Sequence, residues 1–209
     1  HKYWCDNRPD IVTGWNSRFF DIPYLINRLS RIGSIEAVKR LSPWNMINER
    51  NTEITGRTQY GYEIVGIQQA DYLELFKKFG YSYGAQESYK LDHIAHVVLG
   101  EKKLSYEEHG NLYTLYKEDH QKFIDYNIKD VQLVNRIEEK MGLIELAQTM
   151  AYRGGVNLVD TFGVTSIWDS IIYRELNKKN IAIPPNHEKI KMPYAGGYVK
   201  EPQVGLHDW

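Results

Sequence analysis

The strongest pattern in the sequence is an amphipathic one that covers residues 118–141. Apolar side chains recur there at helical spacing, and Gly142 follows the last of them. The apolar positions include Phe123, Ile128, Val134 and Ile137. This spacing predicts one long helix that ends at Gly142. Any fold for this chain must accommodate that helix.

Shorter elements on either side alternate between strand and helix patterns. We expect strands at residues 9–15 and 62–67, and a loop or hairpin at 45–61. We expect helices at 21–32, with Asp21 and Pro23 in the first turn and Gly33 as the stop, and at 34–42, 71–80, 88–100 and 164–179. Strands mixed with helices at these lengths predict an α/β fold. The Pro- and Gly-rich segment that follows, residues 181–209, is typical of an extended connector rather than a closed domain.

Composition excludes several classes of protein. With 42% hydrophobic residues and 25% charged residues, the chain is neither disordered nor collagen-like. Cys5 is the only cysteine, so no internal disulfide can form and a reducing compartment such as the cytoplasm is expected. No apolar run is long enough for a membrane span. The net charge of −1 provides no global attraction to nucleic acid, so a DNA partner would have to be bound locally.

Three residues form a pattern that suits metal-assisted hydrolysis. Asp21 directly follows two aromatic residues at the start of a predicted helix, and Tyr126 and Asp130 are four residues apart on the long helix. That spacing places Tyr126 and Asp130 on one face, roughly 6 Å apart along the axis. Two metal ions can activate a water and neutralise a leaving oxygen. Mg²⁺ and Mn²⁺ prefer oxygen ligands, which carboxylates supply.

Each of these residues also has a simpler interpretation. Asp21 taken alone is typical of a helix cap, Tyr126 of a half-buried aromatic on an amphipathic helix, and Asp130 of a solvated charge. His93 and His96 are three residues apart and could suggest zinc, but no second pair of ligands accompanies them. We therefore interpret both histidines as surface residues.

The joint pattern resembles the family B DNA polymerases over essentially the whole chain. The segment TGWNSRFFDIPYLINR is similar to their second exonuclease motif, and YNIKD is similar to the third, with its Tyr-x-x-x-Asp spacing. Near the end, YAGGYVKEP resembles their Tyr-x-Gly-Gly motif. Within the family, the segments LSP, DYLELFKKF and SYKLDHIA look most like the replicative polymerases of large tailed phages.

The resemblance implies a ribonuclease-H-like 3′→5′ exonuclease fold over residues 1–142. Residues 143–209 would then be a helical and extended connector leading to the polymerase palm. Asp21 and Asp130 would be ligands of two Mg²⁺ or Mn²⁺ ions, and Tyr126 would orient the attacking water. Contacts to DNA would come from Asn16 and Phe20, at the unpaired 3′ end, and from Tyr194, Gly196 and Gly197, at the single-stranded template.

One part of the family pattern is missing. The first exonuclease motif supplies an Asp-x-Glu pair, and this sequence contains none; the polymerase motif Asp-x-x-Ser-Leu-Tyr-Pro is absent too. We therefore expect a piece of a longer polymerase whose exonuclease fold is incomplete at the N-terminus and which is inactive in isolation. Its expected partners are single-stranded DNA, the rest of the polymerase and, through the intact enzyme, a sliding clamp, in the host cytoplasm if the gene is phage-encoded.

Two other functions stay open. The chain could be a non-catalytic module, such as part of a split polymerase or a DNA-binding domain, and the missing Asp-x-Glu pair favours this for the isolated chain. It could also be a free-standing exonuclease of the same fold. The YAGGYVKEP connector argues against that third function, because a free-standing nuclease has nothing to connect to.

Overall fold

The computed structural model describes residues 1–54, 57–101 and 111–183, together with Gly197 and Gly205. The α-helices are α1 (Lys2–Asn7), α2 (Asp21–Ile32), α3 (Ile35–Lys39), α4 (Tyr72–Phe79), α5 (Leu91–Leu99), α6 (Leu112–Glu118), α7 (His120–Met141), α8 (Leu143–Gly154) and α9 (Val164–Lys178). The described residues also form the short 3₁₀ helices η1 (Tyr81–Tyr83) and η3 (Leu158–Phe162). The strands are β1 (Ile11–Gly14), β2 (Ile47–Ile54), β3 (Arg57–Ile64) and β4 (Gln68–Asp71).

The strands form two small sheets, so the fold is mixed α/β, as the sequence predicts. β1 pairs in parallel with β4, from Ile11 opposite Gln68 to Gly14 opposite Asp71. The intervening segment contains α2, α3 and an antiparallel hairpin of β2 and β3, which begins with Ile47 opposite Ile64. The ends of β1 and β4 therefore lie side by side, and each leads directly into a loop or a helix.

β1 lies between two separate hydrophobic cores. Ile11 packs against a first core built from β4, α4, α5, α7, α8 and η3, whereas Val12 packs against a second core built from α2, α3 and β3. Successive side chains of a strand point to opposite faces, so one short strand contributes to both cores. This arrangement fixes the position of the loop that follows Gly14.

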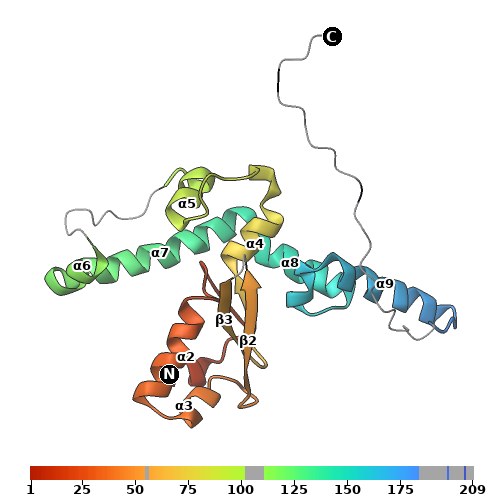
Figure 1. Cartoon of the computed structure of the whole chain (residues 1–209), viewed down its shortest axis with the longest axis horizontal. Helices are drawn as coiled ribbons and strands as arrows, with labels where there is room; N and C mark the ends of the chain where they lie inside the picture. Colours follow the sequence, from red (N-terminus) through yellow and green to blue (C-terminus); the bar gives the residue numbers. More distant parts are fainter. Residues whose placement is uncertain (55–56, 102–110, 184–196, 198–204, 206–209) are drawn as a thin grey trace.

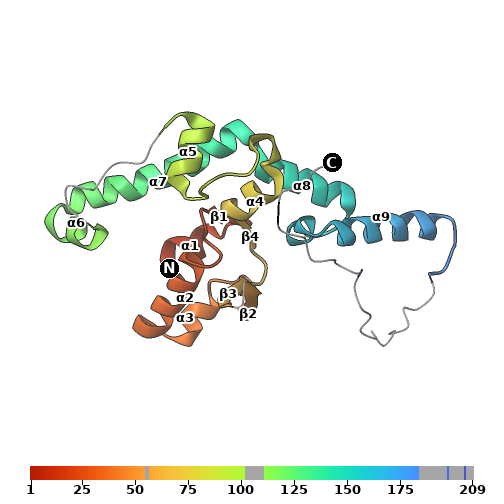
Figure 2. The ribbon, with the colours of Figure 1, turned by 45° about the horizontal axis from the view of Figure 1, so that its top comes forward.

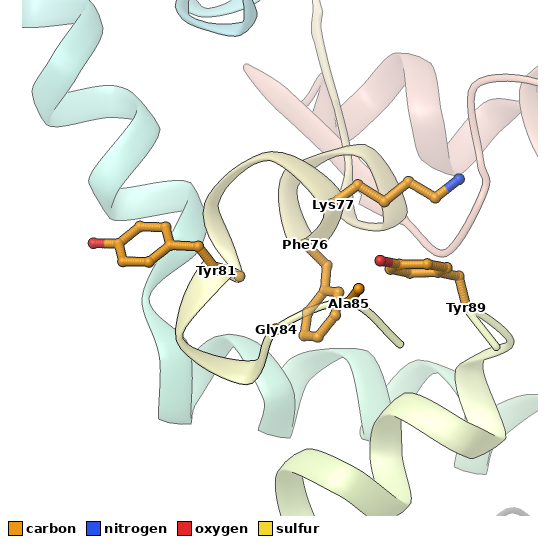
Figure 3. A pocket seen from close by; sticks show the side chains of 7 residues that line it. Phe76, Lys77, Tyr81, Gly84, Ala85 and Tyr89 are labelled. Atoms are coloured by element: carbon orange, nitrogen blue, oxygen red, sulfur yellow. The ribbon is translucent and has the colours of Figure 1, made fainter. Parts of the chain in front are cut away.

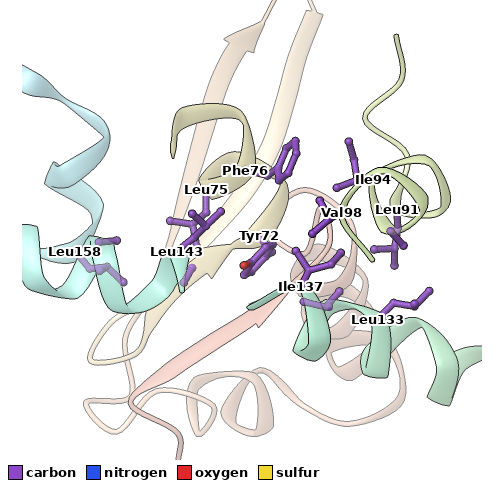
Figure 4. Close-up of a cluster of buried hydrophobic side chains, with 14 residues drawn as sticks. Tyr72, Leu75, Phe76, Leu91, Ile94, Val98, Leu133, Ile137, Leu143 and Leu158 are labelled. Carbon is purple, nitrogen blue, oxygen red and sulfur yellow. The ribbon is translucent and has the colours of Figure 1, made fainter. Parts of the chain in front are cut away.

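The first core is organised along α7 (Figure 4). Leu133 and Ile137 of α7 are fully buried, and they pack with Tyr72 of α4 and Ile94 of α5. The helix ends at Gly142, whose φ of 61° is the left-handed conformation that glycine adopts readily. The prediction of a long amphipathic helix ending at Gly142 is confirmed.

The second core covers the inner face of the hairpin. Ile22 and Ile26 of α2 are buried there with Ile64 of β3. The hairpin at residues 45–61 is confirmed, but the predicted strand at 62–67 is wrong over its second half. β3 ends at Ile64, and a turn through Gly66, with φ of 89°, separates it from β4.

Figures 1 and 2 show how the elements that build the two cores are arranged. α7 runs across the molecule, the lobe of α1, α2, α3, β2 and β3 lies on one side of it, and α8 and α9 extend beyond its C-terminal end. α8 begins at Leu143, and its residues Leu143 and Ala147 belong to the first core. The predicted division at residue 142 stays a prediction. Among the described helices, none combines the length and the hydrophobicity that crossing a bilayer requires.

Candidate functional site

The loop between β1 and α2 is held by a buried carboxylate. Asp71, at the end of β4, is 1% exposed and caps α4 by accepting the backbone N–H of Leu73 at 3.0 Å. Its two oxygens also accept the backbone N–H groups of Asn16 at 3.1 Å and Arg18 at 3.0 Å. One side chain therefore joins the start of α4 to the loop. Burial, the largest cause, raises the pKa of Asp71 above its ordinary value, although the three N–H groups act in the opposite direction.

Further contacts fix the inner side of the same loop. The Trp15 indole N–H donates to the backbone carbonyl of Tyr89 at 3.1 Å, and the Arg18 guanidinium bonds both carboxylate oxygens of Glu74 at 3.3 and 3.1 Å. Asn16 has a φ of 62°, which a non-glycine residue adopts only rarely. The loop therefore keeps a defined, slightly strained shape.

Phe20 and Asp21 lie where this fixed loop becomes α2. The Phe20 side chain is 67% exposed, and Asp21 is also exposed. Asp21 is the first helical residue and Phe20 is the N-cap, so the interpretation of Asp21 as a capping residue is wrong. Protein atoms around the Asp21 carboxyl group still remove enough water to raise its pKa, opposed by a hydrogen bond from its own backbone. A bound cation would offset that desolvation.

Tyr126 and Asp130 lie one helical turn apart on α7. Tyr126 is buried at 9% exposure, and Asp130 is half-buried with its Oδ1 atom inaccessible to solvent. Next to Asp130, Lys129 donates to Glu101 at 3.0 Å, and Arg136 pairs with the same carboxylate. The Lys129 hydrogen bond is the main reason that the pKa of Glu101 is lowered. These ion pairs tie this part of α7 to the chain after α5.

The loop before Asp21 and the middle of α7 contact the same core. Trp15 packs against the first core, to which α7 contributes Leu133 and Val134 just after Asp130. No cluster of three or more potential metal-binding side chains occurs within residues 1–54, 57–101 and 111–183. A shared metal site of Asp21 and Asp130 stays a prediction.

The other predicted site residues lie in the C-terminal segment. Tyr194 and Gly196 are outside the described residues, and Gly197 is exposed. His93 is half-buried and contacts the Gln86 side chain at 3.2 Å, whereas His96 is exposed. Neither histidine belongs to a group of three or more potential metal-binding side chains in the described part of the chain.

A pocket lies away from these residues. It is an open pocket of about 300 Å³ lined by residues of α4, η1 and the loop before α5, including Phe76, Lys77, Gly84 and Tyr89 (Figure 3). The Lys77 ammonium lies 5.2 Å from the centre of the Tyr89 ring. Asp21, Tyr126 and Asp130 do not contribute to it.

Asp71 is the residue of this region that sequence reasoning underestimated. Its role as the residue that opens α4 is predictable from its position before an apolar helix, and it is confirmed. Its contacts with Asn16 and Arg18 span 55 and 53 residues, so no local pattern reports them. The available clue is only the position of Asp71 directly before an apolar helix pattern, and it does not report the contacts with the loop.

Comparison with known proteins places these features in a family context. Residues 1–94 match the family described as DNA polymerase family B, exonuclease domain. The chain is 36% identical to the DNA-directed DNA polymerase of Escherichia phage RB69 over 201 residues, which is 96% of this chain and 22% of the phage protein. It is 32% identical to the DNA-directed DNA polymerase of Enterobacteria phage T4 over 200 residues, with the same two coverages. It is also 28% identical over 215 residues to the DNA polymerase delta catalytic subunit of Plasmodium falciparum, covering 95% of this chain and 19% of that protein. The chain thus spans about a fifth of the length of these relatives.

Proposed function

This chain belongs to the family B DNA polymerases, in the region of their exonuclease domain, and we propose that it contributes to the removal of mispaired 3′ nucleotides during DNA synthesis. In this proposal residues 1–142 are most of a 3′→5′ exonuclease domain with a ribonuclease-H-like fold. Residues 143–209 connect that domain to the polymerase palm. The parallel pair of β1 and β4 would be part of a larger sheet.

The observation that carries the proposal is the fixed loop that presents Phe20 and Asp21 together. Asp71 and Glu74 hold the loop from the inside, and the outer side leaves an aromatic ring and a carboxylate open to solvent. An exposed ring can stack on an unpaired base, and the neighbouring carboxylate would lie next to the terminal phosphodiester. Asn16, in the same loop, would contact the same 3′ end.

The oxygen donors of Asp21 and Asp130 suit Mg²⁺ or Mn²⁺, and we propose that both carboxylates bind these ions in the intact enzyme. When bound, the ions supply an activated water and neutralise the leaving oxygen. Tyr126, one turn before Asp130, would hold the attacking water by a hydrogen bond from its phenol. Tyr194, Gly196 and Gly197 would contact the single-stranded template. The proposed setting is the cytoplasm, with a sliding clamp bound through the rest of the enzyme.

The test is exonuclease activity in the full-length polymerase that contains this segment. Asp21→Ala or Asp130→Ala should remove nearly all degradation of a labelled single strand and leave primer extension largely intact. Tyr126→Phe should have a smaller effect, because it removes a hydroxyl but no charge of the metal site. Asp169→Ala, which removes an exposed carboxylate on α9, is the matched control. Degradation at the parental rate in either of the first two variants would show that the metal-ligand assignment is wrong.

A second function applies to the chain by itself. The sequence contains no Asp-x-Glu pair, which favours a non-catalytic, DNA-binding role when the rest of the polymerase is missing. Incubating the 209-residue chain with a labelled oligonucleotide and Mg²⁺ or Mn²⁺ separates the two functions. We expect no 3′→5′ degradation, and clear degradation would contradict this second function.

A further inference from the structure

The outward side of α2 carries two exposed aromatic rings beside the charged side chains that are usual on the solvent face of an amphipathic helix. With 3.6 residues per turn, Phe20, Tyr24, Arg28 and Arg31 project from one side of the helix. The opposite side carries Ile22, Ile26 and other residues of the second core. Phe20 is 67% exposed and Tyr24 is 65% exposed, and both arginines are exposed.

The charges on this side favour an anionic partner. Asp21 is the only acidic residue of α2, and it lies at the first position of the helix. Neither Arg28 nor Arg31 forms an ion pair with another residue in the part of the chain that the structure describes. Arg31 lies in the last turn, where a cation also stabilises the helix dipole. No such local role accounts for Arg28 or for the exposed ring of Tyr24.

The position of α2 leaves this side accessible. In both views α2 lies to one side of the hairpin, with α3 next to it (Figures 1 and 2). Its inner side is fixed by the second core, and its first residue follows the loop held by Asp71. The exposed groups therefore project from a rigid support, so little ordering is needed when a ligand binds.

We propose that this side of α2 is a binding track for the single-stranded DNA behind the 3′ end. Phe20 stacks on the terminal base, Tyr24 stacks on a base one step further from the end, and Arg28 and Arg31 contact phosphates. Phe20, Tyr24 and Arg28 follow one another at about 6 Å along the helix axis, close to the separation of nucleotides in an extended strand. Aromatic stacking and cation contacts together bind single strands without sequence preference. The position of the 3′ end at Phe20 and Asp21 rests on the proposed function, whereas the roles of Tyr24 and Arg28 go beyond it.

The test measures DNA binding by the intact 209-residue chain, in EDTA so that no metal contributes. The probe is a fluorescein-labelled oligothymidylate of about 12 nucleotides, followed by anisotropy at several salt concentrations. Tyr24→Ala should weaken binding by about 5-fold or more, and Tyr24→Phe should restore most of it because the stacking face is kept. Arg28→Gln should reduce the slope of log Kd against log salt by about 0.7, the value for one phosphate contact on a single strand, and Arg31→Gln should do the same.

The controls are Tyr152→Ala and Arg153→Gln, which remove an exposed ring and an exposed cation from neighbouring positions on α8. Neither should change the affinity or the slope by a comparable amount. A thermal unfolding midpoint for every variant identifies any loss of fold. This control matters most for Arg31→Gln, because Arg31 also stabilises the dipole of α2. The track is overturned if the chain fails to bind the probe at low salt, or if folded Tyr24→Ala and Arg28→Gln variants bind like the parent.

The outcome separates this inference from the proposed function. If Phe20→Ala weakens binding but Tyr24→Ala and Arg28→Gln do not, the track is wrong and the assignment of the 3′ end to Phe20 stands. If Tyr24→Ala and Arg28→Gln weaken binding while Asp21→Ala leaves exonuclease activity of the full-length polymerase intact, the track stands and the metal-ligand assignment fails.

Discussion

The Oδ1 atom of Asp71 accepts the backbone N–H of Asn16 at 3.1 Å, which connects the end of β4 to a loop 55 residues earlier in the chain. The same carboxylate accepts the N–H of Arg18 through its other oxygen. Both strands of the parallel pair end at this point, so the loop cannot move without breaking these bonds or shifting α4. The exposed positions of Phe20 and Asp21 therefore depend on a residue that contacts neither of them directly.

Asp71→Asn should destabilise the protein by about 1–3 kcal/mol, the cost of leaving a buried polar group without its partner. The amide offers one acceptor oxygen and one NH₂ group, so at least one of the three backbone N–H groups loses its acceptor. Urea unfolding followed by circular dichroism measures the change. Asp169→Asn, on the exposed side of α9, is the control and should stay within about 0.5 kcal/mol of the parent. Equal stability of Asp71→Asn and the parent would contradict the role of Asp71.

The difference in unfolding free energy between Asp71→Asn and the parent should change with pH in a definite direction. The pKa of Asp71 is raised in the folded protein, mainly by burial, so the folded state binds its proton more tightly than the unfolded chain does. The resulting stabilisation is fully present below the unfolded pKa of about 3.9 and is lost as pH rises through the folded pKa. Relative to Asp71→Asn, the parent should lose stability as the pH rises from about 4 towards neutral pH and the carboxyl group ionises. Urea titrations of both proteins across this range give the difference, and a difference that grows with pH would contradict the assignment.

A second buried polar contact joins α4, α7 and α8. The Tyr72 hydroxyl donates to Glu138 at 2.8 Å, and the Glu138 carboxylate also accepts the backbone N–H of Ile144 at the start of α8. Tyr72 is fully buried, and its pKa is raised by burial and then by Glu138. Tyr72→Phe should cost about 1.5–3 kcal/mol, the range for a hydrogen bond to a charged group.

Denaturant midpoints at an unchanged m-value are the measurement for Tyr72→Phe. Tyr152→Phe is the matched control, because that tyrosine is 88% exposed and should lose almost nothing. If both variants lose the same small amount of stability, the Tyr72–Glu138 bond does not join the three helices.

The sequence predicts the helices of this fold better than its strand boundaries and long-range contacts. α7 is predictable because its apolar positions recur with the helical period and Gly142 ends them. The break after Ile64 is not predictable. Ile64 and Ile67 are both buried, and the sequence between them is typical of one continuous strand. α8 is also hidden, since it follows Gly142 without a linker.

The sequence likewise predicts some features of the candidate site and not others. Phe20, Asp21, Tyr126 and Asp130 are proposed from spacing and from the resemblance to a family. The exposure of Tyr24 and the contact of Asp71 with Asn16 depend on which side of α2 faces the second core and on how β1 pairs with β4. Both are tertiary properties, so no local sequence pattern reports them.

The turn that breaks the predicted strand gives a further prediction. Gly66 has a φ of 89°, and a Cβ atom there would collide with the Pro43 ring and the Trp44 indole. Neighbouring groups are also held in place, because Ser42 Oγ donates to the Val65 carbonyl at 2.6 Å and the Val65 N–H donates to Met46. Gly66→Ala should therefore destabilise the protein through both backbone strain and collision.

Gly84→Ala separates these two effects. Gly84 also has a positive φ, 66°, but a Cβ atom there would have no neighbour within 4 Å. Its substitution should cost about 1–3 kcal/mol from backbone strain alone, because its φ of 66° and ψ of −171° lie in a region that is essentially confined to glycine. Gly66→Ala should cost at least about 1 kcal/mol more, because overpacking adds to the strain and the Pro43 ring cannot rotate away. Thermal and urea unfolding of the two variants, measured side by side, provide the comparison. Equal losses would mean that Trp44 and Pro43 yield freely, and that the end of β3 is set by backbone conformation rather than by packing against residues 43 and 44.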